Sequence, residues 1–229
     1  MAQRFQLFGW GSNVDTPAQV DPTHDALRAS LRPYETQPDP QGIAGGHYSV
    51  GAQSGTFAAA IADGARVFQV RWADPTRIFI LKKLKVQAIT ATGFAATSIG
   101  CPLQLWLGHG STANGSGGTA LAVSGNKGRA TMSATAFLTS GEIRIGTTAG
   151  LTAATGETLE AIALGGCAGA PATTNTASPE MFLWDTRDAG EHPIVLLPGD
   201  TLAVLTKTPA ATGTAVFVFQ MSWAETSAF

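Results

Sequence analysis

Apolar and polar residues alternate in several short runs of this sequence, with the period of a β-strand that has one buried face. In the C-terminal run Thr214–Glu225, the bulkiest side chains share one face: Phe217, Phe219, Met221 and Trp223. A second run places Leu103, Leu105 and Leu107 on one face. Turns containing Gly or Pro separate eight or more such runs, so the pattern predicts an all-β fold, either a sandwich or a barrel.

The longest run, Arg77–Thr92, alternates imperfectly. Most of its apolar residues occupy even positions, but Phe79 and Leu81 occupy odd positions. We therefore expect its first half to be buried on both faces or to contain a bulge. Five shorter segments are also predicted to be strands: Val67–Trp72, Leu159–Leu164, Met181–Trp184, Ile194–Leu197 and Thr201–Thr206.

The residues Pro198, Gly199 and Asp200 lie between two of these apolar segments and predict a tight turn. Apolar strands joined in this way are common in sandwiches and jelly rolls. We therefore predict that residues 51–229 form a β-sandwich of jelly-roll-like topology.

Three stretches between the predicted strands are rich in Gly and other small residues, which predicts loops: 108–119, 124–129 and 165–179. A phosphate-binding loop would need a Gly-Lys-Ser/Thr sequence that opens a helix. Lys127 is followed by no such helix signal. The sequence therefore favours ordinary loops here over nucleotide binding.

Residues 1–50 differ from the rest, because they contain five prolines and few apolar side chains. A short helix is predicted over Pro22–Leu31, with Asp21 as its cap and Pro33 ending it. We expect residues 1–50 to be an extended arm that docks on a neighbouring subunit, or else an N-terminus that lies along the chain's own surface. The candidate assembly contacts are its apolar residues: Phe5, Leu7, Phe8, Trp10, Leu27 and Leu31.

Charged residues make up only 13% of the 229 residues, and the net charge is −2. Average globular chains contain about 25% charged residues. The 44% hydrophobic content argues against intrinsic disorder, and the lack of excess Lys and Arg argues against nucleic-acid binding. No apolar run approaches the roughly 20 residues of a membrane span, and residues 1–10 lack the apolar core of a secretory signal. We expect a soluble protein without membrane or nucleic-acid partners.

The two cysteines, Cys101 and Cys167, stand among small or apolar residues. We interpret them as small buried hydrophobic side chains, which fits a chain that assembles in a reducing cytosol. Whether they pair remains open.

Residues capable of catalysis or metal binding are sparse. The four histidines, His24, His47, His109 and His192, are far apart, so only a site assembled in three dimensions would bind a metal. The acidic residues Asp185, Asp188 and Glu191 are candidates for a carboxylate pair or a Ca²⁺ site, but Arg187 among them favours a solvated, self-neutralising turn. We predict no enzyme activity, no metal and no cofactor.

Six of the 14 basic residues fall between Arg66 and Lys85. This run predicts either contact with an acidic partner surface or an ordinary solvated strand face. Asp63 and Asp74 lie nearby and favour the solvated face.

The chain resembles a family of structural proteins from the virions of tailed bacteriophages. The resemblance rests on segments spread in order along nearly the whole chain: Trp10–Ser12, His24–Pro33, Gly46–Val50, Ser54–Thr56, Val67–Arg77, Gly190–Leu196 and Gly213–Glu225. It implies a β-rich, non-enzymatic subunit of the particle. Decoration proteins of this size in related particles look like homotrimers.

The resulting first hypothesis is a capsid decoration or cement protein on the exterior of the phage head, assembled in the host cytoplasm. Its expected partners are the major capsid protein and copies of itself. A tail or fibre component that binds a host receptor or glycan is the alternative, with residues 108–119 and the Trp184–Asp185 turn as its recognition surface. A hydrolase that uses Asp185, Asp188 or Glu191 is a third possibility.

Overall fold

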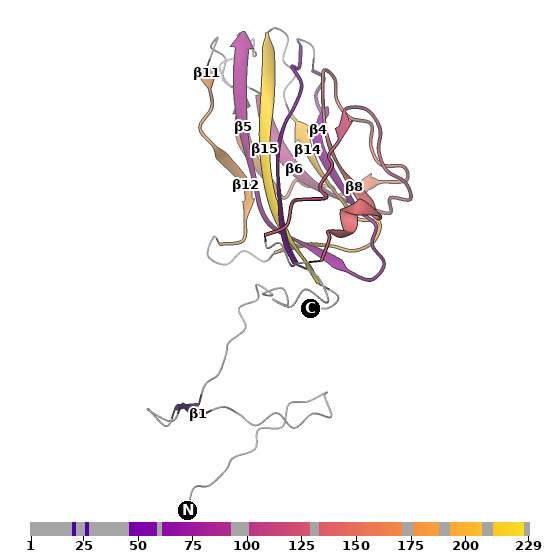
Figure 1. Ribbon diagram of the computed structural model, residues 1–229. Coiled ribbons are helices and arrows are strands. Elements are labelled where there is room, and N and C mark those ends of the chain that lie inside the picture. Colours follow the sequence, from indigo (N-terminus) through magenta and orange to yellow (C-terminus); the bar gives the residue numbers. More distant parts are fainter. Residues whose placement is uncertain are drawn as a thin grey trace, which may run out of the picture. The chain divides into compact units, whose positions relative to one another are not determined.

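Two antiparallel β-sheets pack face to face in the computed structural model, which describes residues 20–21, 26–27, 46–58, 61–92, 101–128, 133–170, 176–187, 193–207 and 213–226 (Figure 1). The first sheet contains β3 (Gly46–Gln53), β5 (Ile78–Thr92), β11 (Thr176–Ala177), β12 (Met181–Asp185), β13 (Ile194–Leu196) and β15 (Thr214–Thr226). The second contains β4 (Arg66–Trp72), β6 (Cys101–His109), β7 (Thr119–Ala120), β8 (Gly141–Ile145), β9 (Thr158–Leu159), β10 (Gly165–Ala170) and β14 (Thr201–Thr206). The predicted all-β sandwich is confirmed.

The main strands pair in a nested order, the first with the last and the following ones inside them. The first sheet runs β3-β15-β5, and β11, β12 and β13 follow one another along the free side of β5. The second runs β10-β6-β14-β4-β8-β7, with β9 also paired to β6. Strands from the two ends of the sandwich pair first, and strands nearer the middle of the chain pair inside them: β3 with β15, β4 with β14, β5 with β12, and β6 with β10.

The space between the sheets is filled mainly by aromatic and branched side chains. The large apolar side chains predicted to share one face of the C-terminal run are buried, and aromatic side chains lie across the core from them. The rings of Phe68 and Phe219 stack with centroids 4.8 Å apart, and Phe137, from the short 3₁₀ helix Ala136–Leu138, meets Trp72 edge-on at 5.0 Å. Such pairs add specific geometry to the apolar burial.

A bulge at Lys82 explains the imperfect alternation of the run Arg77–Thr92. Leu81 lies opposite Trp223 while Lys83 lies opposite Ser222, so Lys82 is an extra residue on β5. The bulge shifts the side-chain parity, so residues on both sides of it enter the same core: Phe79, Leu81, Leu84 and Val86. Ile80, which points the other way, is buried too. Both expectations for this run, burial of two faces and a bulge, are confirmed.

The turn at Pro198–Asp200 is confirmed, and it connects the two sheets rather than two neighbours within one. Gly199 has φ +95°, which glycine adopts without strain. The Asp200 carboxylate accepts the Leu197 N–H at 2.8 Å, and the Asp200 N–H donates to the Leu197 carbonyl at 2.9 Å. The chain thereby passes from β13 in the first sheet to β14 in the second.

The segment 165–179, predicted as a loop, contains strands β10 and β11, so that prediction is wrong. Backbone pairing with β6 decides the conformation of β10, although its residues have weak strand propensity. Glycine is required at the contact with β12, because a Cβ on Gly165 would lie 2.7 Å from the Leu183 carbonyl oxygen. In the neighbouring prediction Leu159–Leu164, only Leu159 belongs to a strand.

Cys101 and Cys167 lie on the neighbouring strands β6 and β10, but not opposite each other. Cys101 is in register with Ala170, and Cys167 is in register with Leu103.

Residues 1–36 and 37–229 form two separate compact units. In the first, β1 (Val20–Asp21) pairs with β2 (Ala26–Leu27), so the predicted helix over Pro22–Leu31 is wrong at Ala26 and Leu27. Backbone pairing with Val20 and Asp21 decides the extended conformation of these two residues. The other helix residues lie outside the described ranges. The sandwich itself starts with β3 at Gly46, inside the range assigned to the arm.

Candidate functional site

The glycine-rich segment predicted as a loop at 108–119 is held against the outer face of the second sheet. Its ends, Gly108–His109 and Thr119, belong to β6 and β7. Arg71 reaches outward from β4 and donates to the Ser111 hydroxyl and to the Asn114 side-chain oxygen, both at 3.0 Å. The Thr152 N–H donates to the Ser116 carbonyl at 2.9 Å. These hydrogen bonds fix the loop on the outer face of the second sheet.

A buried ion pair lies on the same face of the second sheet. Arg66 contacts the Glu157 carboxylate at 2.5 and 3.0 Å, and the Thr201 hydroxyl donates to the same carboxylate. Next to this pair, Gln69 on β4 is only 2% exposed, and neither atom of its side-chain amide has a hydrogen-bond partner. Both charges of the pair are compensated, so these contacts join β4 and β14 to the covering loop and leave neither Arg66 nor Glu157 as a free acid or base.

A second buried carboxylate, Glu225 at the end of β15, is surrounded by donors. It accepts from Arg77 at 3.1 Å, from the Trp223 indole N–H at 3.0 Å and from the Ala136 N–H at 3.0 Å. The Thr135 hydroxyl donates to it as well. The four donors satisfy the carboxylate fully, which is the arrangement of a structural charge rather than a reactive one.

His109 lies at the end of β6 between two carboxylates. Its Nδ1 is 2.8 Å from Asp200 Oδ1, and its Nε2 is 2.8 Å from Glu160 Oε1. The hydrogen bond with Asp200 raises the pKa of the imidazole above its ordinary value, and Glu160 acts in the same direction. This cluster binds a proton more tightly than a free histidine does.

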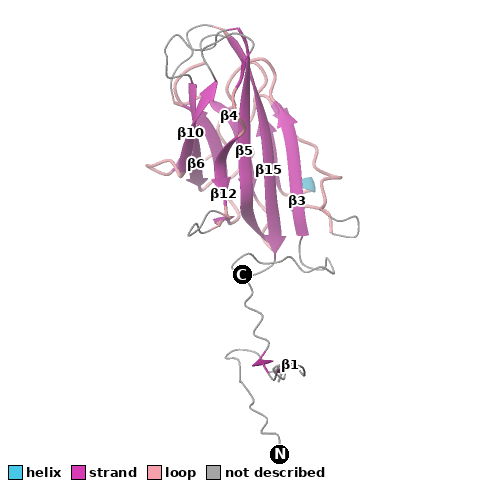
Figure 2. Cartoon of the chain, turned by 90° about the vertical axis from the view of Figure 1, so that its left-hand side faces the viewer, coloured by secondary structure: helices cyan, strands magenta, loops and turns pink. Residues whose placement is uncertain are grey.

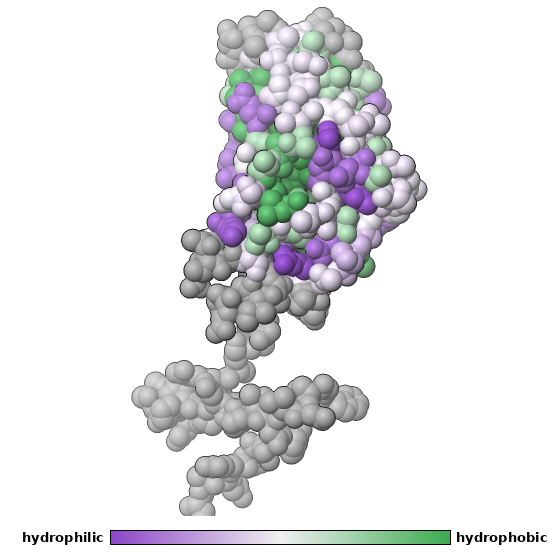
Figure 3. Space-filling view, turned by 45° about the vertical axis from the view of Figure 1, so that its right-hand side comes forward, coloured by the Kyte–Doolittle hydropathy of each residue, from purple (hydrophilic) through white to green (hydrophobic). Residues whose placement is uncertain are grey.

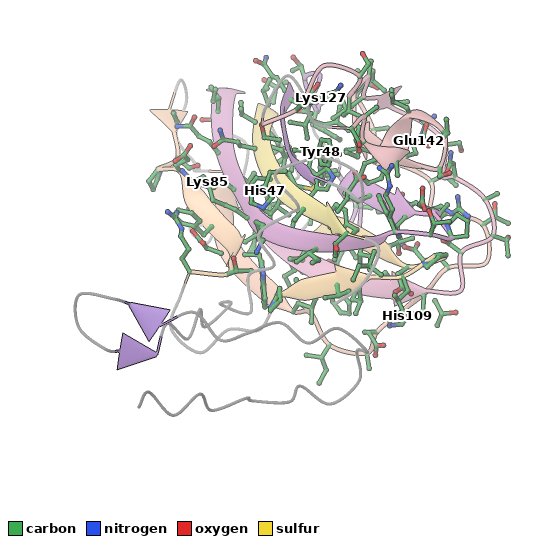
Figure 4. All side chains as sticks on the ribbon, turned by 60° about the horizontal axis from the view of Figure 1, so that its bottom comes forward. His47, Tyr48, Lys85, His109, Lys127 and Glu142 are labelled. Atoms are coloured by element: carbon green, nitrogen blue, oxygen red, sulfur yellow. The ribbon has the colours of Figure 1, made fainter. Side chains whose placement is uncertain are left out.

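The described histidines do not come together. In Figure 4, His109 lies well apart from His47, Lys127 and Glu142, and His24 and His192 lie outside the described residues. Within the described ranges, no group of three or more His, Cys, Asp or Glu residues is placed to hold a metal ion.

The predicted solvated, self-neutralising turn is confirmed at Asp185 in its charge pairing, but the Asp185 side chain is buried and not solvated. The Arg187 guanidinium contacts the Asp185 carboxylate at 3.1 and 3.2 Å, and its backbone N–H donates at 3.0 Å. The hydrogen bond from Arg187 lowers the pKa of Asp185, in spite of desolvation. Asp188 and Glu191, the other proposed acidic residues, lie outside the described residues.

The basic run between Arg66 and Lys85 does not form one surface. Arg66 is buried against Glu157, and Arg77 pairs with Glu225. Lys85 pairs with Glu180, the residue before β12. The expectation of a solvated strand face is therefore wrong for Arg66, because loop 146–157 folds back over β4 and supplies its partner Glu157.

Of the candidate assembly contacts, only Leu27 lies in the described part of the chain, where it is in register with Val20. Phe5, Leu7, Phe8, Trp10 and Leu31 lie outside it.

An open groove of about 510 Å³ is a feature that the sequence reading missed. It is lined by Gln104, Trp106, Ala161, Ile162, Ala163, Gly165, Gly166 and Lys207. The Lys207 ammonium lies 4.9 Å from the centroid of the Trp106 ring. The sequence held one signal for this site: Trp106 alternates with Leu105 and Leu107, so a large aromatic side chain occupies the face of β6 that points away from the core.

Large apolar side chains are also exposed elsewhere on the sandwich: Ile89, Leu138, Phe182 and Leu197. Figure 3 shows, on one side of the molecule, a hydrophobic patch bordered by hydrophilic residues. Exposed apolar patches of this kind mark contact surfaces in many proteins.

Among the described residues, no helix is long and apolar enough to cross a membrane. Comparison of the chain with protein-family models, with curated proteins and with solved structures found no match.

Proposed function

We propose that this chain is a non-enzymatic structural protein of a tailed-bacteriophage particle, most directly a decoration or cement protein on the exterior of the head. In this role it binds the major capsid protein and copies of itself, as a homotrimer, and stabilises the head through contacts between subunits. The proposal rests on the sequence resemblance and on the surface chemistry described above.

The observation that carries the proposal is the distribution of charge and apolar surface. The sandwich compensates its buried charges internally, as in Arg66–Glu157 and Arg77–Glu225, while it exposes large apolar side chains such as Leu138 and Leu197. Surfaces of this kind gain free energy when a neighbouring subunit covers them. Catalysis would instead call for titratable groups that converge on a cleft.

The nested strand pairing supports a jelly-roll-like topology. Eight strands, β3, β4, β5, β6, β10, β12, β14 and β15, pair first with last and then inward, and consecutive strands mostly alternate between the sheets. A double-sheet fold of eight strands built in this way is the arrangement used by viral capsid domains.

The proposed arm is tested by deleting residues 1–45. Because β3 starts at Gly46, this deletion leaves every strand of the sandwich intact. We expect the truncated protein to keep its β-type circular dichroism and to be lost from purified particles. Two full-length variants test whether the apolar side chains of the arm, and not only its length, are needed for incorporation. The test variant changes Phe5, Leu7, Phe8 and Trp10 to Ser. The control changes Gln3 and Gln6 to Ser.

Incorporation of the truncated protein at the level of the full chain would contradict the arm. Absence of the full chain from particles would contradict the structural role altogether. The copy number per particle, measured by quantitative gel, separates the two locations: hundreds of copies fit a head decoration protein, and a handful fit a tail or fibre component.

The alternative is a tail or fibre component that binds a host receptor or glycan. The recognition surface predicted for it is not free, because loop 110–118 is held against β4 and Asp185 is paired with Arg187. One other observation favours it. The groove at Trp106, however, combines an aromatic ring with polar groups, which is the composition of a small-ligand site.

A further inference from the structure

The groove at Trp106 has a fixed frame. Its floor is formed by β6 and β10, which lie side by side (Figure 2). Its wall is the segment 161–163, which leaves the edge of β6 between two backbone hydrogen bonds: Glu160 N–H to the Leu107 carbonyl at 2.9 Å, and Leu164 N–H to the Leu105 carbonyl at 2.8 Å. Because both ends of the segment are bonded to one strand, the groove exists before any ligand arrives.

Small residues keep the groove open next to the ring. Gly165 and Gly166 carry no side chain, and a Cβ on Gly166 would lie 3.3 Å from Gln104 Cγ. Ala161 and Ala163 line the wall, and Ile162, 77% exposed, extends the apolar surface outward.

Three polar groups in the groove have no hydrogen-bond or ion-pair partner among the described residues. The indole Nε1 of Trp106 and Oε1 of Gln104 are both buried without a hydrogen bond. Lys207 forms no ion pair within the described part of the chain, and its ammonium lies over the Trp106 ring. Buried polar groups are normally satisfied, so an unpaired donor and an unpaired acceptor from residues two apart on β6 point to a ligand or to solvent that supplies the missing bonds.

We propose that this groove binds a saccharide that carries one carboxylate, such as a hexuronic acid, whatever the protein's place on the particle. The pyranose ring has a face of C–H groups that suits the Trp106 ring. Gln104 Oε1 and the indole N–H are buried without ligand, and we expect the sugar hydroxyl groups to donate to the first and accept from the second once the Lys207 side chain has moved off the ring. The carboxylate pairs with Lys207. A single cation in the groove matches a single negative charge, whereas phosphate-rich ligands are bound by several cations or by a helix N-terminus.

Lys207 has two positions in this scheme. Without ligand, its ammonium is attracted to the face of the indole ring. When the sugar ring takes that face, the flexible lysine side chain moves to the carboxylate, so that the charge keeps a partner in both states.

The experiment follows the indole N–H resonances of the full-length protein by NMR during titration with glucuronic acid, with glucose and with acetate. The Trp106 resonance is identified by its loss in Trp106→Phe. We expect glucuronic acid to shift this resonance and to bind about tenfold more tightly than glucose, because a charge-assisted hydrogen bond is added. Acetate is expected to leave the resonance nearly unchanged.

Two variants and one control test the assigned groups. Lys207→Gln should reduce the affinity for glucuronic acid to that for glucose, and should leave glucose binding as it is. Trp106→Ala should abolish binding of both sugars, measured by isothermal titration calorimetry because this variant has no Trp106 resonance, with circular dichroism to verify folding. If it unfolds, Trp106→Phe, which keeps a ring but loses the N–H, takes its place in the same calorimetric measurement and should weaken the binding of both sugars. Lys127→Gln, which changes a lysine distant from the groove, should bind like the wild type.

The proposal is overturned if glucuronic acid leaves the Trp106 resonance unmoved, or if acetate shifts it as strongly as glucuronic acid does. It is also overturned if Lys207→Gln keeps the preference for glucuronic acid over glucose.

Discussion

The Arg77 guanidinium and the buried Glu225 carboxylate, 3.1 Å apart, connect the residue before β5 to the end of β15. Glu225 is fully buried, while Arg77 is partly exposed. The same carboxylate binds the N-terminal end of the 3₁₀ helix through the Ala136 N–H. One charge therefore joins the central strand pair of the first sheet to the segment that covers the end of the core.

Replacing Glu225 with Ala is expected to lower the free energy of unfolding by about 3–5 kcal/mol, because four donors lose their acceptor. Arg77→Ala should lower the free energy of unfolding by less, since Glu225 keeps three other donors and Arg77 itself is partly exposed to solvent. Urea denaturation measures both values. Equal costs for the two variants would contradict this ranking.

The protonated state of His109 should stabilise the fold. Asp200 and Glu160 raise its pKa in the folded protein, so the contribution is complete below the ordinary histidine pKa of about 6.5 and is lost as the pH rises through the folded value. His109→Gln should therefore be less stable than the wild type at acidic pH, and this deficit should shrink at alkaline pH.

The difference should stay within about 0.2–1 kcal/mol, because the cluster is half exposed and screened by solvent. NMR titration of the imidazole gives the pKa directly. Among the described contacts, the Glu160 carboxylate bonds only to His109, so Glu160→Gln should lower the pKa of the imidazole. A titration identical to that of free histidine would refute the effect.

Gly141, the first residue of β8, should not tolerate a side chain. Its φ is +92°, and a Cβ would lie 2.3 Å from the Arg71 carbonyl oxygen. We expect Gly141→Ala to destabilise the protein by about 2–4 kcal/mol in thermal or chemical denaturation. Gly51→Ala is the matched control, since nothing lies within 4 Å of its Cβ position, and it should be neutral or slightly stabilising.

Deleting Lys82 should be far more harmful than substituting it. The deletion removes the bulge, so either Phe79 and Leu81 or Leu84 and Val86 would turn away from the core. We expect a loss above about 4 kcal/mol or failure to fold. Lys82→Ala keeps the backbone, including the carbonyl that accepts from the Thr186 N–H at 3.0 Å, and should fold. A deletion variant as stable as Lys82→Ala would show that the register can shift without cost.

The strands with strong alternation could be predicted from the sequence, and those without it could not. The run Thr214–Glu225 has large apolar residues at every second position, so its buried face was evident. Strand β10 consists of Gly, Ala and Cys, and only the neighbouring strand β6 supplies the backbone partners that make it a strand. The prediction Leu159–Leu164 failed beyond Leu159 for a related reason, because 161–163 bows away from β6 between its two anchoring bonds.

The groove at Trp106 could not be predicted from the sequence either. The sequence placed Trp106 in a strand on the face opposite the core leucines, but it gave no indication that Lys207 lies over its ring. Those two residues are distant in the chain and are brought together only because β14 pairs with β6.

The sequence by itself determined the fold class, because a period of two in hydrophobicity fixes which elements form and which of their faces are buried. It also determined the low charge of the chain. Tertiary structure decided which strands are neighbours, and hence the burial of the Arg66–Glu157 pair, the bonds that hold loop 110–118, and the groove at Trp106. Those features depend on long-range pairing between strands, and hydrophobic periodicity carries information only about the nearest residues in the chain.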